Sequence, residues 1–288
     1  MTPNTTEEPM AQATNGSGPA PTEEELSRAR LRLVVRGPVA HVTISRPDRR
    51  NAMTGRTWTT LARIGRTLPE DVRIVVVDGD GDIFSAGIDL GMFSPEGVDG
   101  ERSMVAGLAD GTASDAEVRD YIAGLQEGFL WLRRPDLVTV AAVRGHAIGA
   151  GFQLALSCDL RILADDAQLC MKEPALGLVP DLTGTKPLVD IVGVNRAIEI
   201  CLTARRVGAQ EARDLGLAEL VVPADELSAA VDDVVAALLA TDRAAATATK
   251  ALLQQAAGNT LQQQAEAERA AQAARLAALA RAAADGSR

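Results

Sequence analysis

The chain has 288 residues, of which 47% are hydrophobic, 24% charged and 2% aromatic, and its formal net charge is −10. The hydrophobic share excludes a mainly disordered protein, and the apolar runs are shorter than the ~20 residues that cross a bilayer, which argues against a membrane protein. The acidic balance argues against a nucleic acid partner, although a local cluster of cations can still bind an anionic small ligand. Three scattered cysteines predict neither a disulfide framework nor a zinc site, so we expect a reducing, cytoplasmic compartment.

The N-terminal segment is polar and acidic, without the basic and apolar stretches of a secretory signal, and it predicts a disordered tail over residues 1–29. Two short β runs follow at residues 31–35 and 39–45, and the Gly-Pro turn between them indicates a hairpin. Residues 54–68 carry apolar side chains at helical spacing and predict the first long helix.

The middle of the chain alternates strand and helix patterns. Strands that follow helices in this way predict a parallel sheet with crossover helices, and therefore an α/β fold. The predicted strands are 73–78, 138–143 and 160–164, and the predicted helices are 115–132 and 151–157. Between them, residues 94–114 are turn-rich and poorly patterned, which predicts a mobile lobe.

From about residue 183 the pattern becomes mostly helical, and residues 241–284 are rich in Ala, Gln and Arg. This last segment has few large apolar side chains, so we expect it to pack on another part of the chain or on a neighbouring subunit. The predicted organisation is therefore a tail over 1–29, a core over 30–200 and a helical region over 201–288.

Two familiar site types are set aside. Asp78, Asp80, Asp82 and Asp89 occupy positions 1, 3, 5 and 12 of a calcium-loop template, but Ile83 stands where that loop needs glycine and position 12 should be Glu. No metal site is predicted here. No serine lies in a G-x-S-x-G nucleophile elbow, which argues against a Ser-His-Asp hydrolase.

Two glycine-containing loops each follow a buried strand, at residues 81–90 (GDIFSAGIDL) and 145–154 (GHAIGAGFQL). Small residues let a backbone approach a ligand closely, and the helix that begins in the second loop offers free N–H groups. Each loop alone is explained by a tight strand-to-helix turn. Together they can aim one N–H each at a single carbonyl oxygen, which is the arrangement that stabilises an enolate.

These segments resemble the crotonase superfamily, the enoyl-CoA hydratase/isomerase family. The resemblance extends over residues 31–250 and is carried by Arg46-Pro47 with Asn51-Ala52, FSAGIDL, GHAIGAGFQLALSCDLR and KEPALGLVPDLTGT. It implies a spiral of ββα units with a helical C-terminal trimerisation region, in a homotrimer or homohexamer. It also implies a coenzyme A thioester as the substrate and no further cofactor.

By position, the resemblance assigns the oxyanion-binding N–H groups to Ala86 and Ala150. It places Glu173 as a catalytic acid or base, and Gln153 where hydratases carry a second Glu. Gln cannot take or give a proton as Glu does, although it can orient a water. Asp181 follows Glu173 by eight residues, as in dienoyl-CoA isomerases, and becomes the second acid.

Each assignment has an alternative. Glu173 can alternatively be a surface acid before Pro174, and Asp181 can alternatively be the N-cap of a helix over 182–191. An Asp nucleophile of the dehalogenase type near position 181 is less favoured, because few aromatic side chains are present to line an aromatic pocket.

The resemblance also implies a coenzyme A site. Its phosphates would meet Arg49, Arg50 and Lys250, although all three can equally be solvated surface charges. Its nucleotide pocket would be lined by Ala52, Ser85, Ile88 and Asp89.

The predicted activity is hydration or isomerisation of the double bond of an enoyl-CoA, and the residues leave both reactions open. The alternative is a non-catalytic acyl-CoA-binding protein, suggested by Gln153. Glu173 argues against that alternative, because a pure binder has no need of it.

Overall fold

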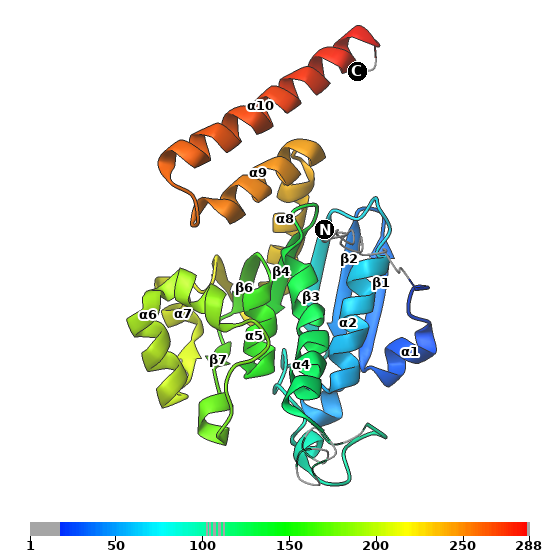
Figure 1. Ribbon diagram of the computed structural model, residues 1–288, viewed down its shortest axis with the longest axis vertical. Coiled ribbons are helices and arrows are strands. Elements are labelled where there is room, and N and C mark those ends of the chain that lie inside the picture. The colour runs from blue at the N-terminus through cyan, green and yellow to red at the C-terminus, as the bar shows by residue number, and fades with distance from the viewer. Residues whose placement is uncertain are drawn as a thin grey trace, which may run out of the picture.

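The computed structural model describes residues 18–286 apart from residues 102, 104, 106, 107, 109, 110 and 112. A six-stranded sheet with the order β1-β2-β3-β4-β6-β9 forms its centre (Figure 1). Its strands are β1 (Leu31–Arg36), β2 (Val39–Ile44), β3 (Ile74–Gly79), β4 (Val138–Val143), β6 (Leu160–Ala164) and β9 (Leu220–Val222).

The pairing confirms the α/β fold expected from the sequence. The hairpin β1–β2 is antiparallel, with Leu31 opposite Ile44, and every other neighbouring pair in this sheet is parallel. The apolar runs of β3 and β4 are buried because helices cover both faces of the sheet. The carboxyl ends of these strands therefore emerge at one edge, where the two glycine-containing loops begin.

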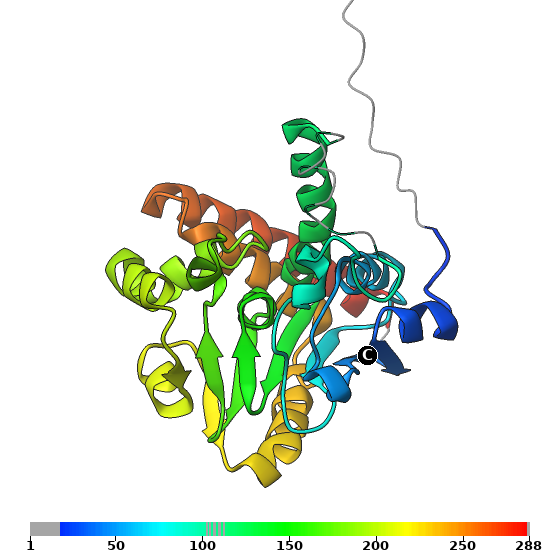
Figure 2. The ribbon, with the colours of Figure 1, turned by 90° about the horizontal axis from the view of Figure 1, so that it is seen from below.

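One face of the sheet packs against α2 (Gly55–Thr67), α4 (Asp115–Leu130) and α5 (Ala150–Ser157), which contribute to the larger apolar core. The opposite face packs against α8 (Leu227–Leu239) through a second, smaller core. Figure 2 shows α8 on the far side of the strands from the other three helices.

A second, three-stranded sheet lies beside the first. It consists of β5 (His146–Ile148), β7 (Gln168–Cys170) and β8 (Val207–Gly208), in the order β5-β7-β8. The helices α6 (Thr185–Thr203) and α7 (Ala209–Asp214) flank it. Strand β5 follows β4 and leads into α5, and β7 follows β6 and leads into η4 (Glu173–Leu176). Because β5 and β7 pair with each other, the start of α5 and the segment after β7 lie close together.

The expected disordered tail was wrong in its last part. Residues 1–17 of it lie outside the described residues, whereas Glu23–Arg28 form the helix α1. Thr22 and Glu25 make a capping box at its start, and Glu25 accepts hydrogen bonds from Arg63 of α2 at 2.8 and 2.9 Å. Helix α1 therefore belongs to the folded core.

The expected domain boundary at residue 200 was also wrong. It falls inside α6, and both β9 and α8 beyond it complete the central sheet and its smaller core. Beyond the sheet and α8 lie α9 (Arg243–Ala256) and α10 (Leu261–Ala284), which project from one end of the molecule (Figure 1). Part of the lobe expected over residues 94–114 lies outside the described residues; η2 (Leu90–Phe93) immediately precedes it.

Candidate active site

The two glycine-containing loops are joined to each other by backbone hydrogen bonds. Ser85 N–H donates to the His146 carbonyl at 2.8 Å, and Ile148 N–H donates to the Ser85 carbonyl at 3.0 Å. Gly87 has φ +91°, and a methyl group added to it would lie 2.5 Å from Ile148 O and 3.5 Å from Ala150 N. Glycine is therefore required at position 87 both for its conformation and for the close contact between the loops.

A third loop, between β2 and α2, holds the first one in place. The amide nitrogen of buried Asn51 donates to the carbonyls of Asp80 and Ile83 at 2.9 and 2.6 Å. The guanidinium of Arg46, also buried, binds the Asp89 carboxylate at 2.8 Å. These contacts stabilise the loop from both of its ends, which matters because a preorganised donor needs a rigid backbone.

The prediction that Ala86 supplies an oxyanion-binding N–H was wrong. The Ala86 N–H already donates to the Arg50 carbonyl at 2.9 Å. Two residues further on, Ile88 lies opposite Met53 in a short parallel bridge. Because Met53 bonds to the residues on either side of Ile88, the N–H of Ile88 itself points away from Met53.

Ile88 and Ala150 therefore provide the available donors. Within the described part of the chain neither N–H has a hydrogen-bond acceptor, and Ala150 is the first residue of α5, where helices leave N–H groups free. Sequence reasoning assigned Ile88 to the coenzyme A pocket and did not identify it as a donor. The signal that identifies it is the bridge to Met53, which no residue pattern encodes.

Glu173 lies beside these donors. It begins the 3-10 helix η4 (Glu173–Leu176), is only 8% exposed, and its Oε1 would lie 3.0 Å from a methyl group placed on Gly149, directly before Ala150. Oε1 accepts a hydrogen bond from Gln153 at 2.7 Å, whereas Oε2 is buried and has no partner among the described residues. The alternative that Glu173 is a surface acid is therefore wrong.

Burial raises the pKa of Glu173 above its ordinary value, and Asp181, when it is ionised, raises that pKa further, while hydrogen bonds from the backbone and from Gln153 act in the opposite direction. A buried carboxylate with one unpaired oxygen can act as a base or acid toward a substrate, and its raised pKa favours that role.

Gln153 lies on α5 and is completely buried. Its carbonyl oxygen accepts hydrogen bonds from the backbone N–H groups of Leu182 and Gly184, at 2.9 and 3.2 Å. The amide is thereby oriented, with its oxygen toward these two N–H groups and its nitrogen toward Glu173. The structure thus brings Gln153 and Glu173 together as the sequence predicted.

Asp181 precedes the Leu182–Gly184 turn. Burial raises the pKa of Asp181, and the charge of ionised Asp181 contributes to the raised pKa of Glu173. Helix α6 begins at Thr185 with Gly184 as its N-cap, so the alternative that Asp181 caps a helix is wrong. The Gln126 side chain of α4 donates to the Asp181 carbonyl at 2.6 Å and helps to hold this turn in place.

A groove of about 410 Å³ opens beside Ile88. Five of its lining residues were predicted for coenzyme A: Arg49, Arg50, Ala52, Ile88 and Asp89. Asp48, Ala86 and Leu90 complete the lining. The Asp89 side chain faces Arg46, so its backbone is what it offers to a ligand. Two arginines near one wall suit an anionic ligand.

Ser85 does not belong to this groove, and its predicted role was wrong. It is fully buried, and both its N–H and its carbonyl are used in the contact between the loops. Its Oγ donates to the Asn51 carbonyl at 2.7 Å and accepts from Gly87 N–H at 3.1 Å. Ser85 instead stabilises the loop that carries Ile88.

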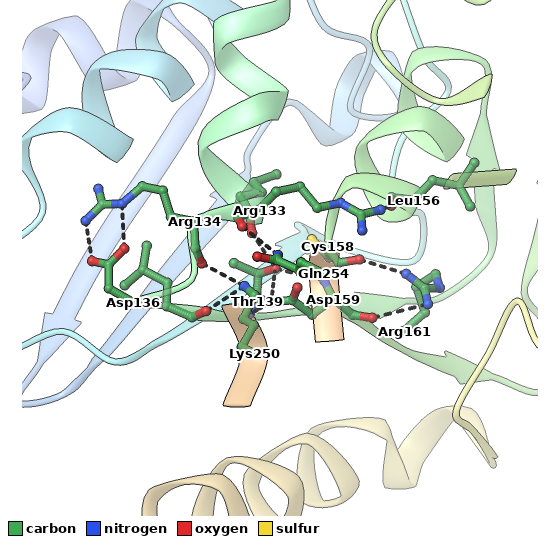
Figure 3. Close-up of polar contacts among 12 residues, drawn as sticks. Arg133, Arg134, Asp136, Thr139, Leu156, Cys158, Asp159, Arg161, Lys250 and Gln254 are labelled. Carbon is green, nitrogen blue, oxygen red and sulfur yellow. Dashed lines mark hydrogen bonds and ion pairs between the residues drawn. The ribbon is translucent and has the colours of Figure 1, made fainter. Parts of the chain in front are cut away.

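Lys250 does not reach the groove either. Figure 3 shows its Nζ surrounded by oxygen atoms from the turn before β4 and from the start of β6. It donates to the carbonyls of Arg134 and Leu137 at 2.8 and 2.7 Å and to Asp159 Oδ2 at 2.6 Å. The expected contact with a coenzyme A phosphate was therefore wrong, because Lys250 fixes α9 to the core.

Two further findings bear on the classes of site set aside above. Within the described residues, no three or more His, Cys, Asp or Glu side chains are grouped so as to hold a metal ion. The described helices include none with the length and apolar character needed to cross a membrane.

Comparison with known proteins agrees with this geometry. A family model described as enoyl-CoA hydratase/isomerase matches residues 35–281. A mitochondrial Δ(3,5)-Δ(2,4)-dienoyl-CoA isomerase of Rattus norvegicus is 34% identical over 190 residues, which are 64% of this chain and 56% of the isomerase. A Mycobacterium tuberculosis protein assigned as an enoyl-CoA hydratase is 32% identical over 191 residues, covering 66% of this chain and 67% of that protein.

Among solved structures, a Thermobifida fusca protein assigned as an enoyl-CoA hydratase, in complex with CoA, is 65% identical. The likeness covers 91% of this chain and 99% of that one, with a TM-score of 0.87. The chain spans little more than half the length of the rat isomerase but nearly all of the Thermobifida protein. The joined loops, the buried glutamate and these matches establish that the chain belongs to the enoyl-CoA hydratase/isomerase family of acyl-CoA enzymes.

Proposed function

We propose that this protein moves the double bond of an enoyl-CoA thioester through an enolate held by the N–H groups of Ile88 and Ala150. The observation that carries the proposal is the unpaired, buried Oε2 of Glu173 beside the loop of Ala150. A carboxylate in this position has desolvation to make it basic and no hydrogen bond to that oxygen to weaken it.

In the proposed reaction the thioester oxygen accepts hydrogen bonds from the Ile88 and Ala150 N–H groups. Ionised Glu173 removes a proton from the α-carbon next to the thioester carbonyl, and the C–H electrons move into the carbonyl and the adjacent double bond to give the enolate. Protonated Asp181 then gives its proton to a carbon further along the chain as the double bond shifts. The product has the formula of the substrate, and proton exchange with water restores the starting charges of the two carboxyl groups.

Gln153 favours isomerisation over hydration. A two-carboxylate hydration needs a second group that gives or takes a proton, and the carbonyl oxygen of this amide is already bound by Leu182 and Gly184. Asp181, whose pKa is raised by burial, remains as the second acid near Glu173.

The groove lined by Arg49 and Arg50 is our proposed site for the phosphates of coenzyme A, and no cofactor beyond the thioester itself is invoked. The groove shares Ile88 with the enolate site. A ligand that runs from the arginines to Ile88 therefore brings its thioester to the two N–H donors. The Thermobifida relative, solved with CoA, supports the ligand class.

We also propose a homotrimer or homohexamer. Val194, Ile198 and Leu202 lie on one side of α6 at four-residue spacing and are more than half exposed, as expected for a face that a second copy covers.

A cytoplasmic location is proposed as well, and the free thiols of Cys158, Cys170 and Cys201 are compatible with a reducing compartment.

The test is to incubate the protein with 2-enoyl-, 3-enoyl- and 3,5-dienoyl-CoA in deuterated water and to identify the products by mass spectrometry and NMR. We expect a product of unchanged formula, apart from deuterium, with a moved double bond. Asp181→Asn is expected to keep exchange at the α-carbon and to slow the double-bond shift by about 100-fold. A product that gains water would instead make the protein a hydratase, and tight binding without exchange or product would make it a binding protein.

A further inference from the structure

Gln153 is the residue through which the two proposed proton-transfer groups are connected. Its amide nitrogen donates to Glu173 Oε1 at 2.7 Å, and its oxygen accepts from the two N–H groups of the turn that follows Asp181. One buried amide thus contacts the Glu173 side chain at one end and the backbone of the Asp181 segment at the other.

The contact with Glu173 leaves the two oxygens of that carboxylate unequal. Oε1 is hydrogen-bonded to Gln153, whereas Oε2 has no partner in the described part of the chain. A neutral N–H donor also stabilises the ionised form of Glu173, and so it opposes the rise in pKa that burial causes.

The contact between the Gln153 oxygen and the Leu182–Gly184 turn also depends on a specific geometry. Thr183, between the two donors Leu182 and Gly184, has φ +67°, a conformation that non-glycine residues rarely adopt. A methyl group added to Gly184 would lie 2.6 Å from Gln153 Cγ, so the turn and the amide are closely packed. The Gln153 oxygen therefore holds the turn, and with it Asp181, against α5.

We propose that Gln153 is a positioning residue that selects Glu173 Oε2 as the reactive oxygen and sets the place of Asp181 relative to it. This inference rests on the proposed function for its consequence, but the positioning itself is testable without turnover. A Glu at this position would keep the acceptor for Leu182 and Gly184 and would change only the end that faces Glu173.

The experiment measures the titration of Glu173 by NMR in protein labelled with ¹³C at the glutamate carboxyl groups, with Glu173→Gln used to identify its resonance. Gln153→Glu places two carboxyl groups within hydrogen-bond distance, and these titrate as a coupled pair. We expect one midpoint of the pair to lie at least about one pH unit above that of Glu173 in the unsubstituted protein. Gln153→Met, which lacks the donor, is expected to show a single midpoint that is also raised.

The matched control is Gln168→Glu. Gln168 lies on β7, five residues before Glu173, and its amide nitrogen lies beside Gly208. We expect this control to leave the Glu173 midpoint within about 0.3 pH units, because Gln168 is only partly buried and solvent screens the added charge.

The same variants are then compared for α-proton exchange. In Gln153→Glu a shared proton makes the pair a weaker base, so exchange at pH 7 is expected to fall about tenfold, with Gln168→Glu within twofold of the unsubstituted protein. Unchanged Glu173 midpoints in both Gln153 variants would overturn the positioning role. Absence of exchange in the unsubstituted protein would overturn the proposed function alone, because the NMR midpoints would still report on Gln153.

Discussion

Two carboxylates, the partly buried Asp159 and the buried Glu173, differ in what surrounds them. Asp159 Oδ2 accepts hydrogen bonds from the Thr139 backbone and side chain and from Lys250, whose Nζ has two further acceptors. Glu173, more deeply buried, has one hydrogen bond on Oε1 and none on Oε2 among the described residues. Figure 3 shows the Asp159 cluster, in which the carboxylate lies between Thr139 and Lys250.

The difference separates structure from chemistry. A carboxylate that is paired with an opposite charge, as Asp159 is with Lys250, offers little to a substrate, and removal of its partner is expected to destabilise the fold. A buried carboxylate that is only half paired keeps an oxygen for proton transfer at the expense of stability. Substitutions around Asp159 are therefore expected to lower stability and to leave activity nearly unchanged. Substitutions around Glu173 are expected to lower activity and not stability.

The largest effect on stability is expected for Lys250→Met. Removal of the ammonium leaves Asp159 and the Arg134 and Leu137 carbonyls without their shared donor, which should lower the free energy of unfolding by about 3–5 kcal/mol. Activity per folded molecule should stay within about threefold, since Lys250 does not line the groove. Urea denaturation and an exchange assay on the same samples measure both.

Lys186→Met is the matched control. Lys186 pairs with Asp190 on the exposed side of α6, and its side chain is 74% exposed. The same substitution there should change the free energy of unfolding by less than about 1 kcal/mol. If Lys250→Met behaved like Lys186→Met in stability but lost coenzyme A binding, the comparison between the two clusters would fail.

The next effect concerns the two glycine-containing loops that carry the proposed enolate site. Gly87→Ala should push the first loop away from Ile148 O and displace the Ile88 N–H, which should lower the rate by about 10²- to 10³-fold. Gly81→Ala has a similar backbone conformation, φ +76°, but its nearest neighbour is 3.8 Å away. Steady-state rates of the two variants separate loop contact from backbone strain, and equal losses would contradict a role for the contact.

A smaller effect is expected in the groove. Arg49→Ala should weaken coenzyme A binding about tenfold through the loss of one charge-assisted contact, and the binding should depend less on salt. Arg36→Ala, at the exposed end of β1, removes the same charge away from the groove. Calorimetric titration of both variants with coenzyme A should show weaker binding for Arg49→Ala alone; equal affinities would remove Arg49 from the site.

The smallest effect is the pH dependence of stability. Burial raises the pKa of folded Glu173 above its unfolded value, so its contribution to stability is present at low pH and is lost as the pH rises through the folded pKa. Glu173→Gln avoids this loss and should gain stability relative to the unsubstituted protein from pH 4 to pH 7.

Asp136→Asn should respond with the opposite sign. Arg134 lowers the pKa of Asp136, so the contribution of this carboxylate to stability is present at neutral pH and is lost as the pH falls. Urea denaturation at both pH values compares the two variants. A loss of stability in Glu173→Gln at pH 7 would show that the ionised carboxylate is not strained by its burial.

Much of the fold was predictable because its main elements carry strong patterns. The apolar runs of β3, β4 and β6 and the helical spacing of α2 have single interpretations. The strands β5, β7, β8 and β9 are only two or three residues long, and such segments show no periodicity. They form because their partners are already in place, so they and the domain boundary near residue 200 depended on tertiary pairing.

The site was more predictable in its side chains than in its backbone, where Ala150 was anticipated as a donor but Ile88 was not. Glu173, Asp181 and Gln153 are visible as residue types, and the structure places Gln153 in contact with Glu173 and with the turn that follows Asp181. The choice between the N–H groups of Ala86 and Ile88 depends on which of them is already bonded, a property of the loop that contacts Arg50 and Met53. Lys250 was misplaced for a related reason, because a cation near the expected position says nothing about which oxygens surround it.

The central claim is that Glu173 Oε2 is the base next to a thioester held by Ile88 and Ala150. The most direct test is deuterium exchange at the α-carbon of a saturated acyl-CoA, which needs the base and the enolate site but no double bond. Glu173→Gln should exchange at least about 10³-fold more slowly while it binds the same ligand within a few-fold of the unsubstituted protein. Exchange within tenfold of the unsubstituted rate would contradict the claim and move the base to another residue.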